Sequence, residues 1–429
     1  MVKPDKTSTV DRQLVNSKFG KWGWSMIVYS FLLYFFMAGI TTDGLNLLPD
    51  AFAAVKGWNA MQILSFATPA GILGVIGSFI SGQFIIKHKP MRTSAVTLII
   101  SGVAYALFGF SPSPIALAVL LFIACFAATG FGMVVPPALM ANWFPRKKGI
   151  ALGWATMGAP ACTAFFVPLL GFLLGRFGLV PAFGVIGAAC VVLGVVTLFW
   201  VKDYPESVGA IPDNLPADSV HAVSSDDLKS YVSPFTIKKL LADKDLWFIS
   251  LGFGCLWMVT VGIVSQFIPR MISVGYEQTE ALFILTVAAL IAMPGSYFWG
   301  WLDQKAGTKL ASIVYAAFYI IALILLILEL EGILVWIAAI FVGVGIGGLL
   351  NLMPSLVITV YGRYDFMAAY RLVAPIATII RVLAFGIMAT LLTMSNGSYT
   401  LPYTVFIFID IIGLIFILLV SGKTKGKMD

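Results

Sequence analysis

Charged residues are scarce along this chain of 429 residues. Lys, Arg, Asp and Glu together make up 11% of the sequence, whereas apolar residues make up 60%. A soluble domain of this size would be about 25% charged and roughly 45–50% apolar. Most of the surface must therefore face lipid, and the composition excludes a soluble enzyme.

Histidine and cysteine are scarce as well. His88 and His221 fall in polar loops, and no zinc-ligand spacing surrounds them. The four cysteines lie inside apolar runs without paired spacing, so we interpret them as small core residues: Cys125, Cys162, Cys190 and Cys255. An enzyme embedded in a membrane needs a nucleophile with a base, or a metal, at membrane depth. We therefore expect no enzyme activity, no metal and no cofactor.

Long apolar runs take up most of the chain. Each has about 20 largely uncharged residues, enough to cross a hydrocarbon layer of about 30 Å as a helix. We predict an all-α membrane protein with about twelve such helices, over residues 22–44, 60–86, 93–111, 114–141, 149–174, 180–201, 246–272, 280–302, 307–328, 332–360, 367–393 and 401–421. Residues 1–18 are polar, and we expect no cleavable signal.

The long hydrophilic segment inside the chain divides it into two halves. Residues 202–245 carry several prolines and the polar stretch Ser224–Lys229, as is typical of a linker. We predict a six-helix bundle over 1–201, a cytoplasmic linker over 202–245 and a second six-helix bundle over 246–429.

The two halves also repeat at an offset of about 217 residues. Gly82 corresponds to Gly300, and the segment after Pro145 corresponds to the segment after Gly362. A third match pairs Gly130, Gly132 and Pro136 with Gly345, Gly347 and Pro354. Two such repeats predict a pseudo-twofold transporter whose site lies between them near mid-membrane.

Basic residues are distributed unevenly among the loops. With a cytoplasmic amino terminus, most of them fall on the cytoplasmic side: Lys3, Lys6, Arg12, Lys18, Lys21, Lys87, Lys89, Arg92, Arg146, Lys147, Lys148, Lys305, Lys309, Arg363, Lys423, Lys425 and Lys427. The opposite loops hold little more than Lys56, Arg176 and Arg270. Because cytoplasmic loops carry an excess of Lys and Arg, we predict that both termini are cytoplasmic. The net charge of +7 then reflects membrane topology and implies no nucleic-acid partner.

Four segments resemble transporter signatures. Gly20–Trp24 resembles the glycine and tryptophan signature that begins monocarboxylate transporters. Trp143–Gly153 is similar to that family's second signature and to the matching segment of bacterial oxalate/formate antiporters. Gly300–Lys309 resembles the major facilitator loop motif, and Tyr204–Gly209 is similar to bacterial members of the oxalate/formate group. The resemblance implies a major facilitator fold and transport by alternating access.

The same motifs suggest where the bundles are locked together. A charge cluster at the cytoplasmic helix ends can hold one bundle against the other through pairs that break when the bundles rock. We assign this gate to Asp303, Gly300 and Gly307 with the basic run Arg146, Lys147 and Lys148. The alternative for the basic run is a plain positive-inside anchor. The first-half loop Gly82–Lys89 has no Asp where the second half has Asp303, so a lock there must be weaker or built differently.

Arg381 is the main candidate for binding substrate. A charge at mid-bilayer costs roughly 2.5–3.5 kcal/mol on insertion scales, and Arg381 falls near the middle of the helix over 367–393. The oxalate/formate family carries a basic substrate-binding residue in this helix, and that position falls at Ala377, one turn before Arg381. Either Arg381 clamps an anion through paired hydrogen bonds, or it forms a structural pair with Asp410 in the last helix.

Other family positions are replaced in this chain. The substrate-binding lysine of monocarboxylate transporters falls at Thr42, beside Asp43, which either couples protons or merely caps the helix end. The family's Asp/Arg pair in helix eight falls at Ala292 and Ser296. Other residues could line a cavity, although each is more often structural: Tyr34, Asn351 and Tyr370.

The expected function is secondary active transport across the bacterial inner membrane. We predict a small organic acid, of monocarboxylate type with a single negative charge, moved by proton symport or by exchange. Asp43 and Asp410 are the candidates for proton coupling. The main alternative is a zwitterionic or cationic substrate such as a betaine or amine, and a membrane-embedded enzyme is a remote one. The expected partners are the substrate, protons or a counter-substrate and the lipid bilayer, with the chain a monomer.

Overall fold

The computed structural model describes residues 18–216, 231–328 and 332–427. The amino-terminal Lys3, Lys6 and Arg12, the loop residue His221 and the stretch Ser224–Lys229 lie outside the described residues. Within the described ranges the ordered elements are helices and turns.

The first bundle contains six spanning units, several of them built from consecutive helices. Two π-helical turns interrupt these units, Gly130–Val134 between α6 and α7 and Cys162–Phe166 between α9 and α10. The helices are α2 Gly20–Thr41, α3 Leu48–Lys56, α4 Ala60–Ser65, α5 Ala67–Ala106, α6 Pro114–Thr129, α7 Val135–Trp143, α8 Lys148–Thr156, α9 Gly158–Ala161, α10 Val167–Phe177 and α11 Leu179–Trp200.

The second bundle consists mostly of longer helices. A short helix, α13 Ile237–Leu241, leads into it from the linker. The bundle consists of α14 Lys244–Ser273, α15 Gln278–Ala306, α16 Thr308–Ile327, α17 Ile333–Ile346, α18 Leu349–Met394 and α19 Thr400–Leu419. The helices on either side of the predicted linker therefore end at Trp200 and begin at Lys244.

Two of the helices are long because each joins two membrane crossings. The backbone of α5 breaks at Lys89, and that of α18 breaks at Gly362, both at positive φ. Ten continuous stretches among the described residues are long and apolar enough to span a membrane, and α17 is a shorter apolar helix. When α5 and α18 are divided at these breaks, and α17 is joined to the first part of α18, the chain makes twelve crossings, as the apolar runs predict.

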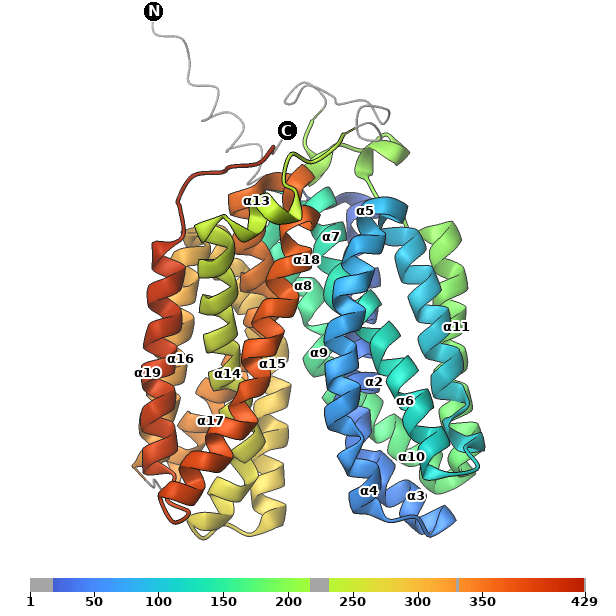
Figure 1. Ribbon diagram of the computed structural model, residues 1–429, viewed down its shortest axis with the longest axis vertical. Helices are drawn as coiled ribbons and strands as arrows, with labels where there is room; N and C mark the ends of the chain where they lie inside the picture. The colour runs from blue at the N-terminus through green and yellow to red at the C-terminus, as the bar shows by residue number, and fades with distance from the viewer. Residues whose placement is uncertain (1–17, 217–230, 329–331, 428–429) are drawn as a thin grey trace, which may run out of the picture.

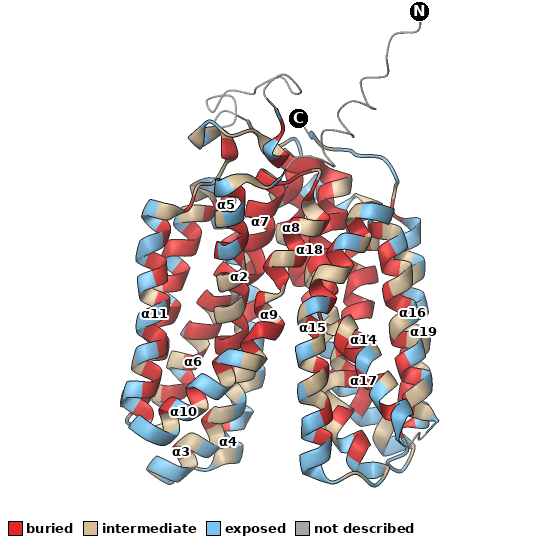
Figure 2. Ribbon diagram, turned by 180° about the vertical axis from the view of Figure 1, so that it is seen from behind, coloured by how far each residue is buried: buried red, intermediate tan, exposed pale blue. Residues whose placement is uncertain are grey.

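The two bundles stand side by side (Figure 1). They pack closely at the end where the linker and the carboxyl terminus lie, and the ribbons diverge toward the opposite end. Buried residues concentrate in α7, α8 and α18 at the closed end, whereas the outer faces of α11, α16 and α19 are largely exposed (Figure 2). We call the closed end the linker end and the other the open end.

Candidate functional site

A cavity of about 520 Å³ lies between the two bundles. The first bundle contributes lining residues from α2, the segment after it and the α8–α10 unit, and the second contributes α14, α15, α17 and α18. Most of the lining is apolar, with Met37, Trp257, Leu285 and Phe385 among the larger side chains. Such a cavity, apolar with a few polar groups, is the usual form of a small-molecule site.

Arg381 brings the positive charge into this cavity from α18. Its guanidinium lies over the indole of Trp257, 4.8 Å from the ring centroid. The ion pairs in the part of the chain that the structure describes involve other residues. A guanidinium stacked on an aromatic ring keeps its hydrogen-bond donors available at its edge, where a carboxylate could bind.

The structure does not show the alternative pairing of Arg381 with Asp410. Asp410 is fully buried inside the second bundle, and neither of its carboxyl oxygens has a hydrogen-bond partner. The groups with which it interacts electrostatically are Cys255, Tyr315 and Tyr319. The pair is absent from this conformation because α18 directs Arg381 into the cavity, whereas Asp410 faces α14 and α16.

Thr42 and Asp43 line the cavity on the side of the first bundle. Helix α2 ends at Thr41, and Asp43 begins a short 3-10 turn in which its carboxylate caps no helix. Instead, the Thr163 hydroxyl donates a hydrogen bond of 2.6 Å to Asp43 Oδ2. The carboxylate therefore lies at the cavity wall, opposite the bundle that carries Arg381.

The other residues predicted to bind substrate lie outside the cavity in this conformation. Tyr34 and Tyr370 are buried, and Tyr370 stacks on Phe366 at 4.8 Å. Ser296 Oγ donates to the Ala292 carbonyl within its own helix. Asn351 Nδ2 donates to the Gly149 carbonyl of the other bundle, so it belongs to the closed interface.

The predicted gate residue Asp303 is buried at the linker end, at the centre of a polar cluster. Its carboxylate accepts hydrogen bonds from Ser355 Oγ at 2.5 Å and Thr308 Oγ1 at 2.6 Å. Lys148 from the first bundle interacts electrostatically with Asp303 and donates a hydrogen bond to Thr359 on α18. Lys148 thus joins the bundles here.

The rest of the basic run is fixed by its backbone. The amides of Arg146 and Lys147 donate to the carboxylate of Asp213 in the linker, Lys147 at 2.8 Å. The Arg146 carbonyl accepts from Gln304 Nε2 of the second bundle at 2.9 Å. Burial raises the pKa of the Asp213 carboxyl to about 6, although these amides oppose the shift.

The first-half loop is locked by a different pair. Arg371 Nη1 on α18 donates a hydrogen bond of 2.5 Å to Gln83 Oε1 on α5. Gln83 belongs to the segment Gly82–Lys89, which has no Asp where the second half has Asp303. A neutral amide therefore accepts the hydrogen bond there. Arg371 was not among the predicted site residues, although a charge within an apolar run could have indicated it.

Glycines bring the two bundles into backbone contact at the linker end. A Cβ added to Gly300 on α15 would lie 2.3 Å from the Gly149 carbonyl oxygen and 2.8 Å from the Cα of Gly153, both on α8. A Cβ on Gly82 would meet Arg371 at 2.8 Å. We call the contact among Gly149, Gly153 and Gly300 the glycine seam. By contrast, Gly307 has open space around its Cα and forms the turn before α16 at φ 85°.

Comparison with known proteins decides the family. Residues 91–380 match the family model of the Major Facilitator Superfamily. The chain belongs to the major facilitator superfamily. As a member of this superfamily it is a multi-pass membrane protein of the twelve-helix fold and a secondary transporter.

Curated relatives within the superfamily transport different substrates. The chain is 28% identical to a gentisate transporter of Corynebacterium glutamicum over 72% of this chain and 68% of the relative. It is 22% identical to a probable hexose phosphate transport protein of Chlamydia pneumoniae over 69% of this chain and 67% of the relative. It is also 25% identical to monocarboxylate transporter 14 of Mus musculus, over 49% of this chain and 41% of the relative.

Solved structures share the superfamily fold. The proton:xylose symporter XylE aligns with a TM-score of 0.72 at 13% identity, over 94% of this chain and 97% of that one. The Escherichia coli fucose:proton symporter FucP aligns with a TM-score of 0.68 at 16% identity, over 92% and 99%. At such identities the likeness concerns the fold alone.

Proposed function

We propose that this protein transports a small organic acid with one negative charge and an apolar body, and that the substrate carboxylate binds Arg381 in the central cavity. The observation that carries this proposal is an arginine at the wall of an apolar cavity, stacked on Trp257. A guanidinium binds a carboxylate through two parallel hydrogen bonds. The apolar lining would hold the rest of the substrate, and the hydroxyls of Thr42 and Ser265 could orient it.

The similarity to a gentisate transporter is consistent with such a substrate, since gentisate is an aromatic monocarboxylate. Monocarboxylate transporters are also among the relatives. The replacement of the family's other charged positions by Thr42, Ala292 and Ser296 leaves a single cation for the anion, which favours a single carboxylate. A dicarboxylate would leave its second charge in an apolar wall.

We further propose that the linker end is cytoplasmic and that the cavity is accessible from outside in this conformation. Transport would then alternate between this state and one in which the gate around Asp303 and Gln83 opens and the open end closes. The driving force would be a proton gradient or exchange against a second anion.

A zwitterion is the second candidate, because Asp43 lies at the wall of the same cavity. A betaine or amino acid could place its cationic end near Asp43 and its carboxylate at Arg381. The two candidates differ in the role of Asp43, which the anion does not need.

Uptake by proteoliposomes tests the proposal. Purified protein would be offered labelled aliphatic and aromatic monocarboxylates, dicarboxylates and betaines. Because a hydrogen bond to a charged group contributes about 1.5–3 kcal/mol, Arg381→Ala should raise the KM for the transported carboxylate by about 10- to 100-fold. Arg381→Lys should restore only part of the affinity, since Lys offers no planar fork.

Arg176→Ala is the matched control, because Arg176 is an exposed arginine in the last turn of α10. It should leave the KM unchanged. Full carboxylate transport by Arg381→Ala would contradict the proposal. The zwitterion would be favoured if the wild-type protein transports a betaine but no simple carboxylate, and if Asp43→Asn loses the betaine transport.

A further inference from the structure

Asp410 is a buried acid for which substrate binding gives no role. It stands in the middle of α19, fully buried, with both carboxyl oxygens lacking hydrogen-bond partners. A buried ionised carboxylate is strongly unfavourable without a partner, so the conformation described here accommodates the neutral acid. An ionisable residue at membrane depth is by default a functional residue.

No cation faces this acid from the neighbouring helices that the structure describes. The groups that interact with it electrostatically are Cys255 on α14 and the two tyrosines Tyr315 and Tyr319 on α16. The arginines of α18, which also packs on α19, make their contacts elsewhere: Arg363 with Glu206, Arg371 with Gln83 and Arg381 with Trp257. Asp410 is the charged residue of α19 itself.

The tyrosines connect the acid with the central cavity. Thr260 on α14 lines the cavity, and its hydroxyl is 2.7 Å from the hydroxyl of Tyr315. Tyr319 packs on Tyr315, with ring centroids 5.1 Å apart, and its buried hydroxyl interacts with those of Thr260 and Tyr315. The series from cavity to acid is therefore Thr260, then Tyr315 with Tyr319 beside it, then Asp410.

These tyrosines have little room to move away. A Cβ added to Gly345 would lie 2.3 Å from the Tyr319 ring, and one on Gly348 would lie 2.6 Å from the Tyr315 ring. Both glycines lie where α17 meets α18, so the backbone of that junction covers the two rings. A hydroxyl pair held between a cavity and a buried carboxyl supplies the cavity side of a proton relay, and the step from Tyr315 to Asp410 has no hydrogen bond in this conformation.

We propose that Asp410 takes up and releases the transported proton, and that Thr260 and Tyr315 carry this proton between Asp410 and the cavity. The proposal rests on the proposed function, since it supplies the proton coupling for the same cavity. On uptake, a hydronium ion in the cavity gives a proton to Thr260 Oγ and becomes water. Thr260 turns its own hydrogen from the Leu256 carbonyl and passes it to Tyr315, and Tyr315 passes its hydrogen to the carboxylate. Each hydroxyl ends with one hydrogen, and the carboxylate becomes the neutral acid.

The last transfer occurs when the carboxyl turns toward Tyr315 or when one water stands between them. Asp410 is then neutral in the conformation described here, in which the linker end is closed. It would release its proton in the conformation in which the linker end is open. Asp43, which accepts a hydrogen bond from Thr163 at the cavity wall, takes no part in this relay.

Two transport assays on the same proteoliposomes separate proton coupling from substrate binding. Accumulation driven by a pH gradient needs the proton, whereas counterflow, the exchange of labelled for unlabelled substrate at equal pH, needs only the substrate site. Asp410→Asn mimics the neutral acid at nearly equal volume. We expect it to lose accumulation and to retain counterflow.

Tyr315→Phe is the second variant, because it keeps the packing and removes one hydroxyl from the relay. We expect at least about tenfold slower gradient-driven uptake, with counterflow unchanged, since a positioned proton donor contributes typically 10²–10⁴-fold. Tyr403→Phe is the matched control: Tyr403 is a buried tyrosine of α19 whose hydroxyl lacks a partner and lies outside the relay. It should leave both assays unchanged.

The outcomes distinguish the two proposals. Gradient-driven accumulation by Asp410→Asn at the wild-type level, or unchanged uptake by Tyr315→Phe, would overturn the relay. Wild-type counterflow of a carboxylate without any gradient-driven accumulation would also overturn it, and would leave the substrate proposal standing. A wild-type protein that moves no carboxylate in either assay would refute the proposed function itself.

Discussion

At the scale of single residues, several of the charges inside this chain belong to one of two groups. Arg381 and Asp43 border the central cavity, whereas Asp303, Arg363 and Arg371 have partners at the linker end. Asp410 belongs to neither group, which is why we assign it a separate role. Charged side chains at membrane depth thus mark either the path of the substrate or the contacts that close it.

The carboxyl-terminal tail is held by a cluster of three charges. Lys425 Nζ lies 2.5 Å from Asp243 Oδ1 and 2.6 Å from Asp245 Oδ2. Burial acts to raise the pKa of Asp243, but the hydrogen bonds from Lys425, the Asp245 amide and Tyr361 prevail and lower it. Burial likewise acts to lower the pKa of Lys425, and its hydrogen bonds with the two aspartates raise it.

These shifts predict the pH range over which the tail stays docked. The lowered pKa of Asp243 stabilises the docked tail above 3.8, its ordinary value, and this contribution is lost as the pH falls through the folded value. The raised pKa of Lys425 stabilises it below 10.5 and is lost as the pH rises through the folded value. The tail should therefore be held between these limits and should detach in stronger acid.

Amide hydrogen exchange of residues 424–427 measures this docking. At neutral pH, Asp243→Asn should increase the exchange by up to about fivefold, because a partly exposed pair contributes at most about 1 kcal/mol. Asp50→Asn, an exposed acid on α3, is the control. Equal protection of the tail in Asp243→Asn and wild type would show that the cluster does not hold it.

At the scale of elements, the closed end depends on how near α8 and α15 can approach. A Cβ on Gly300 would meet backbone atoms of Gly149 and Gly153, which cannot turn aside. Gly300→Ala should therefore force the linker end apart. Since overpacking typically costs 1–3 kcal/mol, the closed population should fall by at least about fivefold.

Double electron–electron resonance, which measures the distance between two spin labels, would give the fraction of molecules with the linker end closed. The labels would replace two exposed residues at the linker end, Lys87 beside the break in α5 and Lys305 in the last turn of α15, in a background without the native cysteines. We expect a longer distance between the two labels in Gly300→Ala than in the protein that keeps Gly300. Gly171→Ala, on α10 with open space around its Cα, should give the same distances as the wild type. Unchanged distances in Gly300→Ala would rule out the seam as the closing contact.

Sequence alone predicted the helices well and their joints poorly. Apolar runs reveal each crossing because lipid requires a helix, but they do not show that α5 continues through Lys89 or α18 through Gly362 without a loop. The internal repeat is visible in the backbone too: Lys89 at φ 66° matches Gly307 at φ 85°, and Gly178 at φ 77° matches Gly397 at φ 87°. The repeat therefore reaches the turns as well as the helices.

The site could be predicted only in part, because a sequence shows which residues are charged but not which way they face. Arg381 and Asp43 were recognised as charges at membrane depth, and whether they bind substrate stays a prediction. The pair Gln83–Arg371 joins residues far apart in the chain, and no local pattern reveals it. Asn351 and Tyr370 were assigned to a cavity although they pack in the closed interface and core.

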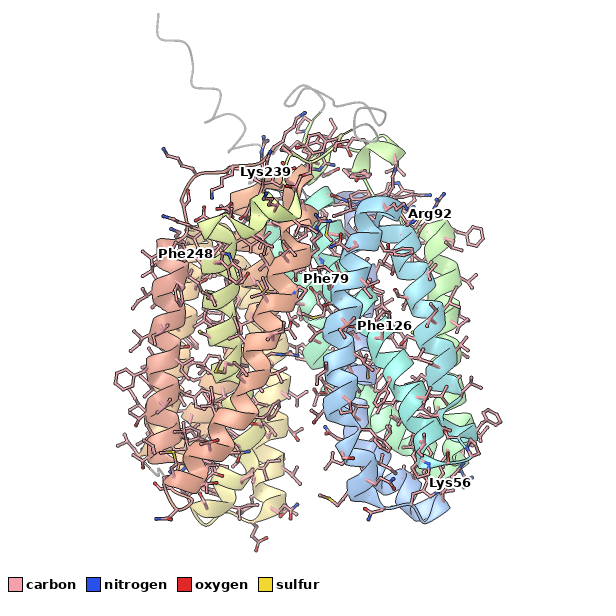
Figure 3. The ribbon with its side chains drawn as sticks, in the orientation of Figure 1. Lys56, Phe79, Arg92, Phe126, Lys239 and Phe248 are labelled. Atoms are coloured by element: carbon pink, nitrogen blue, oxygen red, sulfur yellow. The ribbon has the colours of Figure 1, made fainter. Side chains whose placement is uncertain are left out.

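At the scale of the whole molecule, the distribution of positive charge gives the orientation. Arg92 and Lys239 lie at the linker end and Lys56 at the open end (Figure 3). Because cytoplasmic loops carry the excess of Lys and Arg, the linker end should be cytoplasmic.

Reporter fusions test this orientation. Green fluorescent protein fused after Lys427 should fluoresce, and alkaline phosphatase at the same place should be inactive, because the carboxyl terminus would lie inside. Phosphatase fused after Asn396, in the turn between α18 and α19 at the open end, should be at least about tenfold more active than phosphatase fused after Lys427. The reverse pattern would invert the proposed direction of access.

The glycine seam has one more consequence, for the energy of the conformational change. Glycine has no side chain, so parting Gly149 and Gly153 from Gly300 exposes little apolar area, and the hydrophobic penalty scales with area at about 25 cal/mol per Å². The seam fixes the closed geometry sharply while adding little to its free energy. The balance between the two states is then left to the contacts around the seam, the polar groups at the linker end and the packing of Trp154 on Tyr297, and the binding of one carboxylate has only these to overcome.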